Sequence, residues 1–139
     1  MKDTSYPIRK AYYALITGLG YTCFDFQATD NATKPYVILS SQTSQSENTK
    51  SSFDNRATIN IDIVTSFDDG FGGRKALDLI VNAILEAVIP TPSTTGITVA
   101  GFNIYSTKKL IDFDLPPLQQ STQTFFRRII TFEHLIEQV

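Results

Sequence analysis

A strictly alternating segment at residues 57–65 constrains the fold of this 139-residue chain more than any other feature. Isoleucine occupies every second position from Ile59 to Ile63, and the positions between are Thr58, Asn60 and Asp62. A period of two residues is typical of a β-strand with one buried face and one face in solvent. We therefore expect a sheet whose core side carries the isoleucines.

A second alternating segment, residues 124–137, predicts the last strand of that sheet. One of its faces is apolar and consists of Phe126, Ile130, Phe132 and Ile136. The opposite face mixes charged and polar residues with aliphatic ones, and consists of Arg127, Ile129, Thr131, Glu133, Leu135 and Glu137. Such a mixed face indicates that another element or a partner covers it.

Two other segments have the helical period of 3.6 residues. Residues 5–17 place Ile8, Tyr12 and Leu15 on one face, and residues 76–88 do the same with a stripe that includes Leu77, Ile80 and Ile84. Prolines at 90 and 92 end the second segment. The sequence thus predicts two amphipathic helices.

The remaining segments complete the expected fold. Residues 21–26 and 36–39 read as short strands, and 97–104 as a strand whose alternation changes phase, which predicts a β-bulge at Gly101. Residues 110–118 contain two consecutive prolines and are expected to be irregular. The order α-β-β-β-α-β-β predicts one α+β domain over residues 1–139, with a mainly antiparallel or mixed sheet of four to five strands and both helices on it.

Residues 40–52 consist of Ser, Thr, Gln and Asn with one Glu and one Lys. This composition predicts a long polar loop or the tip of an extended hairpin, because no aliphatic side chain is present to bury. Core packing cannot offset the cost of ordering such a segment, about 1–2 kcal/mol per residue. We expect an arm that is mobile in the free protein and becomes ordered against a neighbouring subunit.

The composition of the chain disfavours several classes of function. Twelve Lys and Arg residues against fourteen Asp and Glu residues give a net charge of −2, which disfavours general nucleic-acid binding. No apolar run approaches the roughly 20 residues that cross a bilayer, and a single Cys cannot form an internal disulfide. With one His, one Cys and no Trp, we expect no catalytic residue, no cofactor and no metal in a protein that folds in a reducing cytoplasm.

The glycine-rich stretch at residues 69–75 lies where phosphate-binding loops occur, between a strand and a helix. It fits neither the Walker signature nor the dinucleotide signature, because Lys75 stands where the latter needs a third glycine. Two aspartates at its start would also repel an anion. We favour a capped helix start with a flexible entry, and a small nucleotide-binding module or enzyme remains the weaker alternative.

Other candidate sites have ordinary explanations. The acidic pairs Asp68/Asp69 and Asp112/Asp114 have no His or Cys near them in sequence, and alternation predicts a solvent face for the second pair. Cys23 and His134 are far apart in sequence, and a nucleophilic pair needs them together in the fold. A buried small hydrophobe and an ordinary strand histidine are the favoured interpretations.

The sequence resembles the small tail-completion or tail-terminator proteins of long-tailed bacteriophages and prophages over nearly its whole length. The resemblance rests on an N-terminal helix and on PYVIL at 35–39, ATINIDIVT at 57–65, GGRKAL at 72–77 and FRRIITFE at 126–133. It implies a structural virion protein that forms a ring, usually a hexamer, at the head-proximal end of the tail tube. The polar stretch at 40–52 is longer than in that family's pattern.

The resemblance also implies partners: further copies of the chain, the tail tube protein and the head-tail connector or neck protein. DNA is expected to pass through the ring without specific binding, and assembly is expected in the cytoplasm of the host. The candidate interface residues are Gln42, Glu47, Asn48, Lys50, Arg127 and Glu133. A head-completion or connector adaptor on the portal side is the alternative, which only the docking partner distinguishes.

Overall fold

The computed structural model describes residues 1–29, 32–68, 74–120 and 122–139. In this part of the chain six strands form one mixed sheet in the order β1-β2-β3-β6-β4, with β5 also paired to β6. Only β1 and β2 run parallel. The strands are β1 (Cys23–Phe24), β2 (Tyr36–Ser46), β3 (Asp54–Asp68), β4 (Phe102–Asp114), β5 (Leu118–Gln120) and β6 (Gln123–Gln138).

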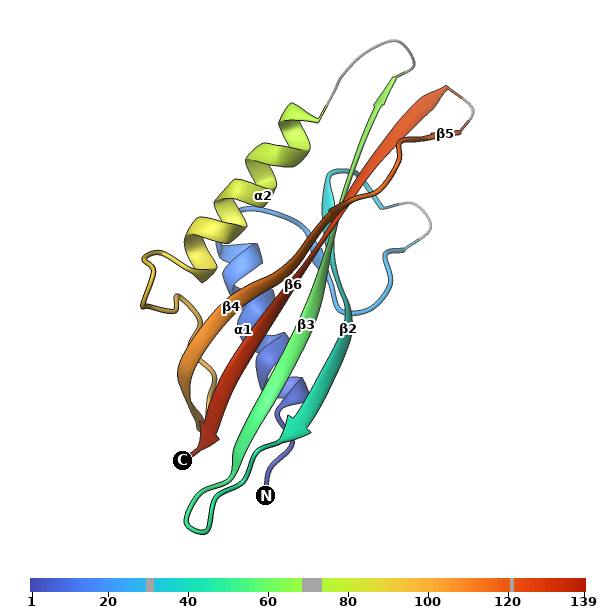
Figure 1. Cartoon of the computed structure of the whole chain (residues 1–139). Helices are drawn as coiled ribbons and strands as arrows, with labels where there is room; N and C mark the ends of the chain where they lie inside the picture. Colours follow the sequence, from blue (N-terminus) through green and yellow to red (C-terminus); the bar gives the residue numbers. More distant parts are fainter. Residues whose placement is uncertain (30–31, 69–73, 121) are drawn as a thin grey trace.

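Both helices, α1 (Ser5–Gly18) and α2 (Lys75–Val88), lie on the same side of the sheet (Figure 1). The predicted α+β class and element order are therefore confirmed, with β5 as an added short strand. No helix in the described residues is both long and apolar enough to cross a membrane. The described part of the other side of the sheet carries no helix (Figure 1).

The core lies between the helices and the sheet, as the alternation predicts. Three isoleucines of β3, Ile59, Ile61 and Ile63, are fully buried. Their partners on the neighbouring strand β6 are Phe132, Ile130 and Arg128 respectively. The two helical stripes close the core from the other side. Their buried members are Ile8, Tyr12 and Ile16 of α1 and Leu77, Ile80, Val81, Ile84 and Val88 of α2.

The sheet is much longer than the layer that covers it. With 16 residues, β6 spans about 50 Å at 3.3 Å per residue, whereas each 14-residue helix spans about 21 Å. The β2–β3 hairpin extends past the start of α1 at one end, and the far ends of β3 and β6 extend past α2 at the other (Figure 1). The helices therefore leave both ends of the sheet uncovered.

The prediction of a loop at residues 40–52 is wrong for the first half of this segment, which belongs to strand β2 as far as Ser46. The backbone there pairs with β3, and hydroxyl groups add contacts such as Thr43 Oγ1 to Thr58 Oγ1 at 2.5 Å and Ser44 Oγ to Asn55 Oδ1 at 2.8 Å. Sheet pairing orders this segment without apolar burial. The expected extended hairpin is correct, with its turn at residues 47–53.

Residues 97–118 also differ from expectation. Ile97 and Val99 are buried outside any strand, and Gly101, at φ +84°, lies in the turn that precedes β4. The register of β4 against β6 shifts around Tyr105 and Leu110 instead. Because β4 continues to Asp114, most of the segment expected to be irregular is paired with β6.

Candidate interaction surface

The side chains most capable of catalysis are sealed in the core. His134 is fully buried, and its Nε2 lies 2.5 Å from the Tyr12 hydroxyl, which is itself fully buried. Cys23 is also buried, and burial, with the Asp25 charge as a second cause, raises the pKa of its thiol to about 12. Neither group presents a reactive atom to a substrate.

Hydrogen bonds fix the protonation of His134. Its Nδ1 lies 2.9 Å from Thr107 Oγ1, and the Thr107 hydroxyl donates to Thr95 Oγ1 at 3.0 Å. Thr107 must therefore accept from Nδ1–H, and the Tyr12 hydroxyl donates to Nε2. This is the neutral tautomer, and burial lowers the pKa of His134 to about 4.

Of the two acidic pairs, the Asp68 side chain and Asp69 lie outside the described part of the structure, and Asp112/Asp114 differs from the predicted solvent-facing pair. Asp112 lies on the helix side of the sheet, where Arg128 Nε and Nη2 donate to its two carboxylate oxygens, each at 2.6 Å. Arg128 also reaches Asp78 of α2 at 3.0 Å, so it joins strand to helix. These bonds from Arg128 lower the pKa of Asp112. Asp114 is exposed, and no metal-binding cluster of His, Cys, Asp or Glu occurs in the described residues.

The glycine-rich candidate site lies mostly outside the described residues, which resume at Arg74. The expected capped start is wrong, because helix α2 begins at Lys75 and no side chain caps its N-terminus.

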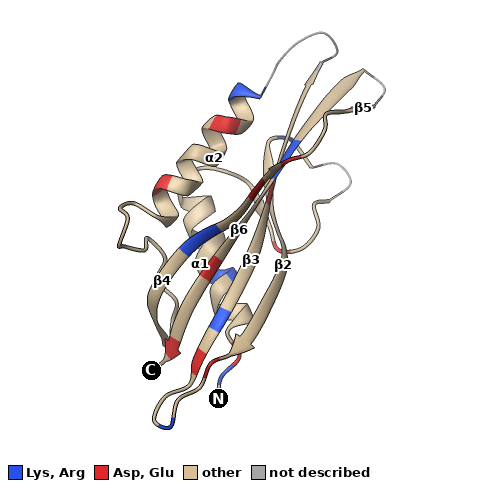
Figure 2. Ribbon diagram, in the orientation of Figure 1, with Lys and Arg blue, Asp and Glu red and all other residues tan. Residues whose placement is uncertain are grey.

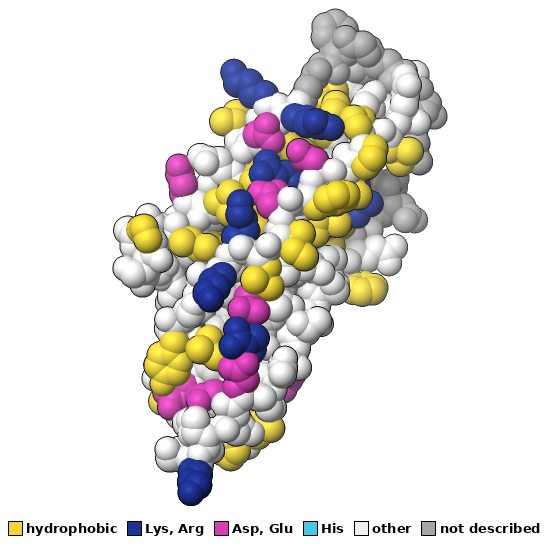
Figure 3. Space-filling model, in the orientation of Figure 1, with side chains coloured by type: hydrophobic (Ala, Val, Ile, Leu, Met, Phe, Trp, Pro, Cys, Tyr) yellow, Lys and Arg dark blue, Asp and Glu magenta, His cyan; other side chains and the backbone are white. Residues whose placement is uncertain are grey.

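The helix-free face of the sheet has an apolar half toward the β5 end. Ile111, Phe113 and Leu118 are each more than half exposed there. Half-buried Phe125 and Ile129 of β6 lie beside them on the same face, by the register of β4 and β6 with β3. Figure 3 shows hydrophobic side chains gathered on this part of the molecule. We call these five residues the apolar sheet patch.

One buried ion pair lies at the centre of this face. Asp62 is 3% exposed although it points away from the helices, because the Arg127 guanidinium covers it through Nε at 3.3 Å and Nη2. The Asp62 bond raises the pKa of Arg127. The solvent-exposed aspartate predicted from the alternation is therefore wrong, because its partner on β6 covers it.

Toward the β2–β3 turn the same face becomes polar (Figure 2). Arg56 bridges two strands and the turn, with Nε 2.6 Å from Glu47 Oε1 and Nη1 3.0 Å from Glu133 Oε1. The hydrogen bond from Arg56 lowers the pKa of Glu47. Tyr105 of β4 donates to Glu137 of β6 beside them. These contacts hold the polar half of the face in one arrangement.

The structure separates the candidate interface residues into three groups. Glu133 and Arg127 lie on the helix-free face, and Glu47, Asn48 and Lys50 lie in the hairpin turn, where Asn48 and Lys50 are exposed. Gln42 instead points toward α1, where it accepts from Arg9 Nη1 at 2.8 Å and donates to the Ser5 carbonyl at 3.0 Å. The sequence analysis did not select the apolar sheet patch. The signal for it is the LIDF run at 110–113, in which Ile111 and Phe113 are two residues apart and so share one face of a strand.

We expect Arg127→Ala to lower the free energy of unfolding by about 2 kcal/mol, because it leaves the Asp62 carboxylate buried without a partner. The value lies below the 3–5 kcal/mol typical of fully buried pairs because about half of the Arg127 side chain is exposed. Urea denaturation measures it. Adding Asp62→Asn should recover part of the loss, and an unchanged stability in the single variant would refute the burial argument.

Comparison with known proteins finds similarity among solved structures. No family model and no curated protein matches the sequence. Among solved structures, a chain from the "Virion of native gene transfer agent (GTA) particle" has the same fold, with a TM-score of 0.71 over 99% of both chains. The two sequences are 12% identical, so the likeness establishes a shared fold across essentially the whole chain.

Proposed function

We propose that this protein is a structural component of a phage-like virion, in which it forms a ring at the head-proximal end of the tail tube. The ring stops growth of the tube and joins the tail to the head-tail connector. The observation that carries the proposal is the fold shared with a gene transfer agent virion chain over 99% of both chains. The proposed location is the virion, after assembly in the host cytoplasm.

The distribution of surface and core supports an assembling protein over an enzyme. The reactive side chains are sealed inside, whereas an apolar patch and two uncovered sheet ends face outward. Exposed apolar surface and unpaired strand edges are features that partner chains cover in assemblies. A net charge of −2 also suits a ring through which DNA passes without being held.

We further propose that the β2–β3 turn, with Glu47, Asn48 and Lys50, contacts the tail tube protein or the neighbouring subunit. The Gln42 side chain anchors the base of this hairpin to α1, and Arg56 ties Glu47 to β6 through Glu133. The hairpin therefore projects as a stiff arm beyond the helices. Such an arm can present a few polar side chains at a fixed position.

Deleting the gene from its phage or prophage tests the proposal. A terminator's absence should give tubes of uncontrolled length that carry no heads, because nothing caps the growing end. A connector adaptor's absence should instead leave tails of normal length beside separate, filled heads. Electron microscopy of the lysates distinguishes these outcomes, and normal finished particles would contradict both structural roles.

Replacing residues 48–51 by a two-residue Asn-Gly turn tests the arm separately. The hairpin should still form, because Asn-Gly favours the tight turns that connect antiparallel strands. We expect an unchanged melting temperature with the yield of finished particles reduced at least tenfold. Asn82→Ala on the exposed side of α2 is the control, and normal particle yield from the shortened protein would refute the role of the turn.

A further inference from the structure

We propose that the apolar sheet patch of one subunit packs against the exposed face of helix α1 of the next copy, so that a helix covers each side of the sheet. This inference rests on the proposed ring and names the surfaces that build it. The sheet patch and the α1 face lie on opposite sides of each subunit (Figure 1). One subunit can therefore use both surfaces at once.

The first surface is the apolar sheet patch, whose large hydrophobic side chains are exposed to solvent. Phe113 of the edge strand β4 is 53% exposed, and Ile111 on the same strand is 57% exposed. A groove of about 380 Å³ continues the patch toward β2, lined in part by Leu118, Phe125 and Arg127. A contiguous surface of this kind, with aromatic side chains and an arginine, has the composition of the centre of a protein interface.

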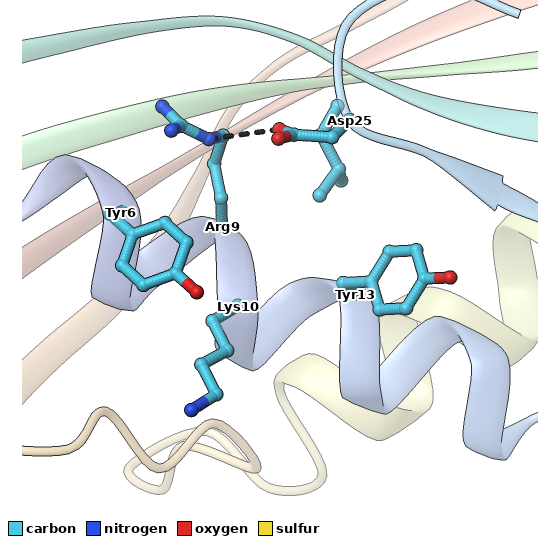
Figure 4. A pocket seen from close by; sticks show the side chains of 6 residues that line it. Tyr6, Arg9, Lys10, Tyr13 and Asp25 are labelled. Atoms are coloured by element: carbon cyan, nitrogen blue, oxygen red, sulfur yellow. Dashed lines mark ion pairs between the residues drawn. The ribbon is translucent and has the colours of Figure 1, made fainter.

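The second surface is the outward face of α1. Tyr6 and Tyr13 are 62% and 47% exposed, and they lie two helical turns apart with Lys10 between them (Figure 4). Hollows of about 220 and 300 Å³ flank Tyr6 and Lys10 on the two sides of the helix. Large side chains from a partner can enter these hollows. Tyrosines contribute strongly to binding at interfaces because they add contact area with few rotatable bonds.

The two surfaces match in size. Helix α1 is about 21 Å long, and half of the roughly 50 Å sheet is about 25 Å. One helix therefore covers the apolar half of the face and leaves the polar half free. Packing helices on both faces of a sheet is one of the stable layer arrangements of proteins, and here the second layer comes from another subunit.

The symmetry of a ring favours this pairing over a contact between two identical sheet faces. The helix-free face and its turn carry five carboxylates, Glu47, Asp54, Asp62, Glu133 and Glu137, and five cations, Lys34, Lys50, Arg56, Lys108 and Arg127, so their charges balance. A contact between two such identical faces closes a dimer. A contact between different surfaces is what a cyclic ring requires.

Two double variants and their mixture test the inference. The sheet variant is Ile111→Ser with Phe113→Ser, and the helix variant is Tyr6→Ser with Tyr13→Ser. Leu79→Ser removes an equally exposed aliphatic side chain from α2 and is the matched control. Native mass spectrometry, with and without tail tubes, measures the assembly, and circular dichroism with thermal melting verifies that each variant folds.

We expect rings from the wild type and from Leu79→Ser, and only monomers from each double variant. An equimolar mixture should form a one-to-one heterodimer and nothing larger, because each variant retains the surface that the other lacks. If the helix variant still forms rings, or the mixture stays monomeric, the pairing is wrong while the ring stands. A wild type that remains monomeric even on tail tubes contradicts the proposed ring and the pairing together.

Discussion

The substitution Ile61→Asp is expected to abolish the folded protein. Ile61 is fully buried in the middle of β3, between Leu39 of β2 and Ile130 of β6. A carboxylate there has no partner among these apolar neighbours, and removing the isoleucine also leaves a cavity. Both effects together cost about 5 kcal/mol or more, which equals the whole stability of many small domains. The measurement is the fraction of expressed protein in the soluble part of the lysate.

Thr43→Asp is the matched control for this prediction. Thr43 is an exposed sheet residue of β2, so a carboxylate there stays in water. We expect normal yield and a loss of at most about 1 kcal/mol, from the hydrogen bond to Thr58. Folded Ile61→Asp at wild-type yield would contradict the position of the core.

Acidification is expected to destabilise the protein between about pH 6.5 and pH 4 through His134. Burial lowers its pKa to about 4 from the ordinary 6.5, so the unfolded chain takes up a proton in this range and the folded chain does not. Stability is therefore complete above pH 6.5 and falls as the pH decreases. A shift of about 2.5 pH units corresponds to about 3 kcal/mol at pH 4.

The test compares urea unfolding at several pH values for the wild type and for Tyr12→Phe with His134→Leu. The double variant removes both buried partners together, and Thr107 keeps its bond to Thr95. Its stability should be nearly flat between pH 6.5 and pH 4.5. Carboxylates such as Asp112, whose pKa Arg128 lowers, lose their contribution at lower pH. Parallel pH profiles for the two proteins would refute the role of His134.

The sequence predicted best those elements that combine regular periodicity with apolar residues. Strands β3 and β6 and both helices have buried faces, and in each case the period identified the face correctly. His134 belonged to the same pattern, because it shares the parity of Ile130, Phe132 and Ile136 on β6. Parity alone would have placed it in the core.

Elements ordered by other forces were missed. The second half of β2 has no apolar face, and its order comes from backbone pairing with β3, which periodicity does not record. Burial of Asp62 depends on Arg127, 65 residues away in the chain. The apolar sheet patch combines β4, β5 and β6, and so became visible only when their register was known.

Cryo-electron microscopy of the purified protein mixed with tail tubes tests the central claim most directly. We expect a ring at one end of each tube, with the helix-free face of one subunit against α1 of the next and the β2–β3 turn reaching the tube or the neighbouring subunit. The tubes should also stop elongating when the protein is added. Bare tube ends, continued elongation and a protein bound only to the portal side of heads would contradict it.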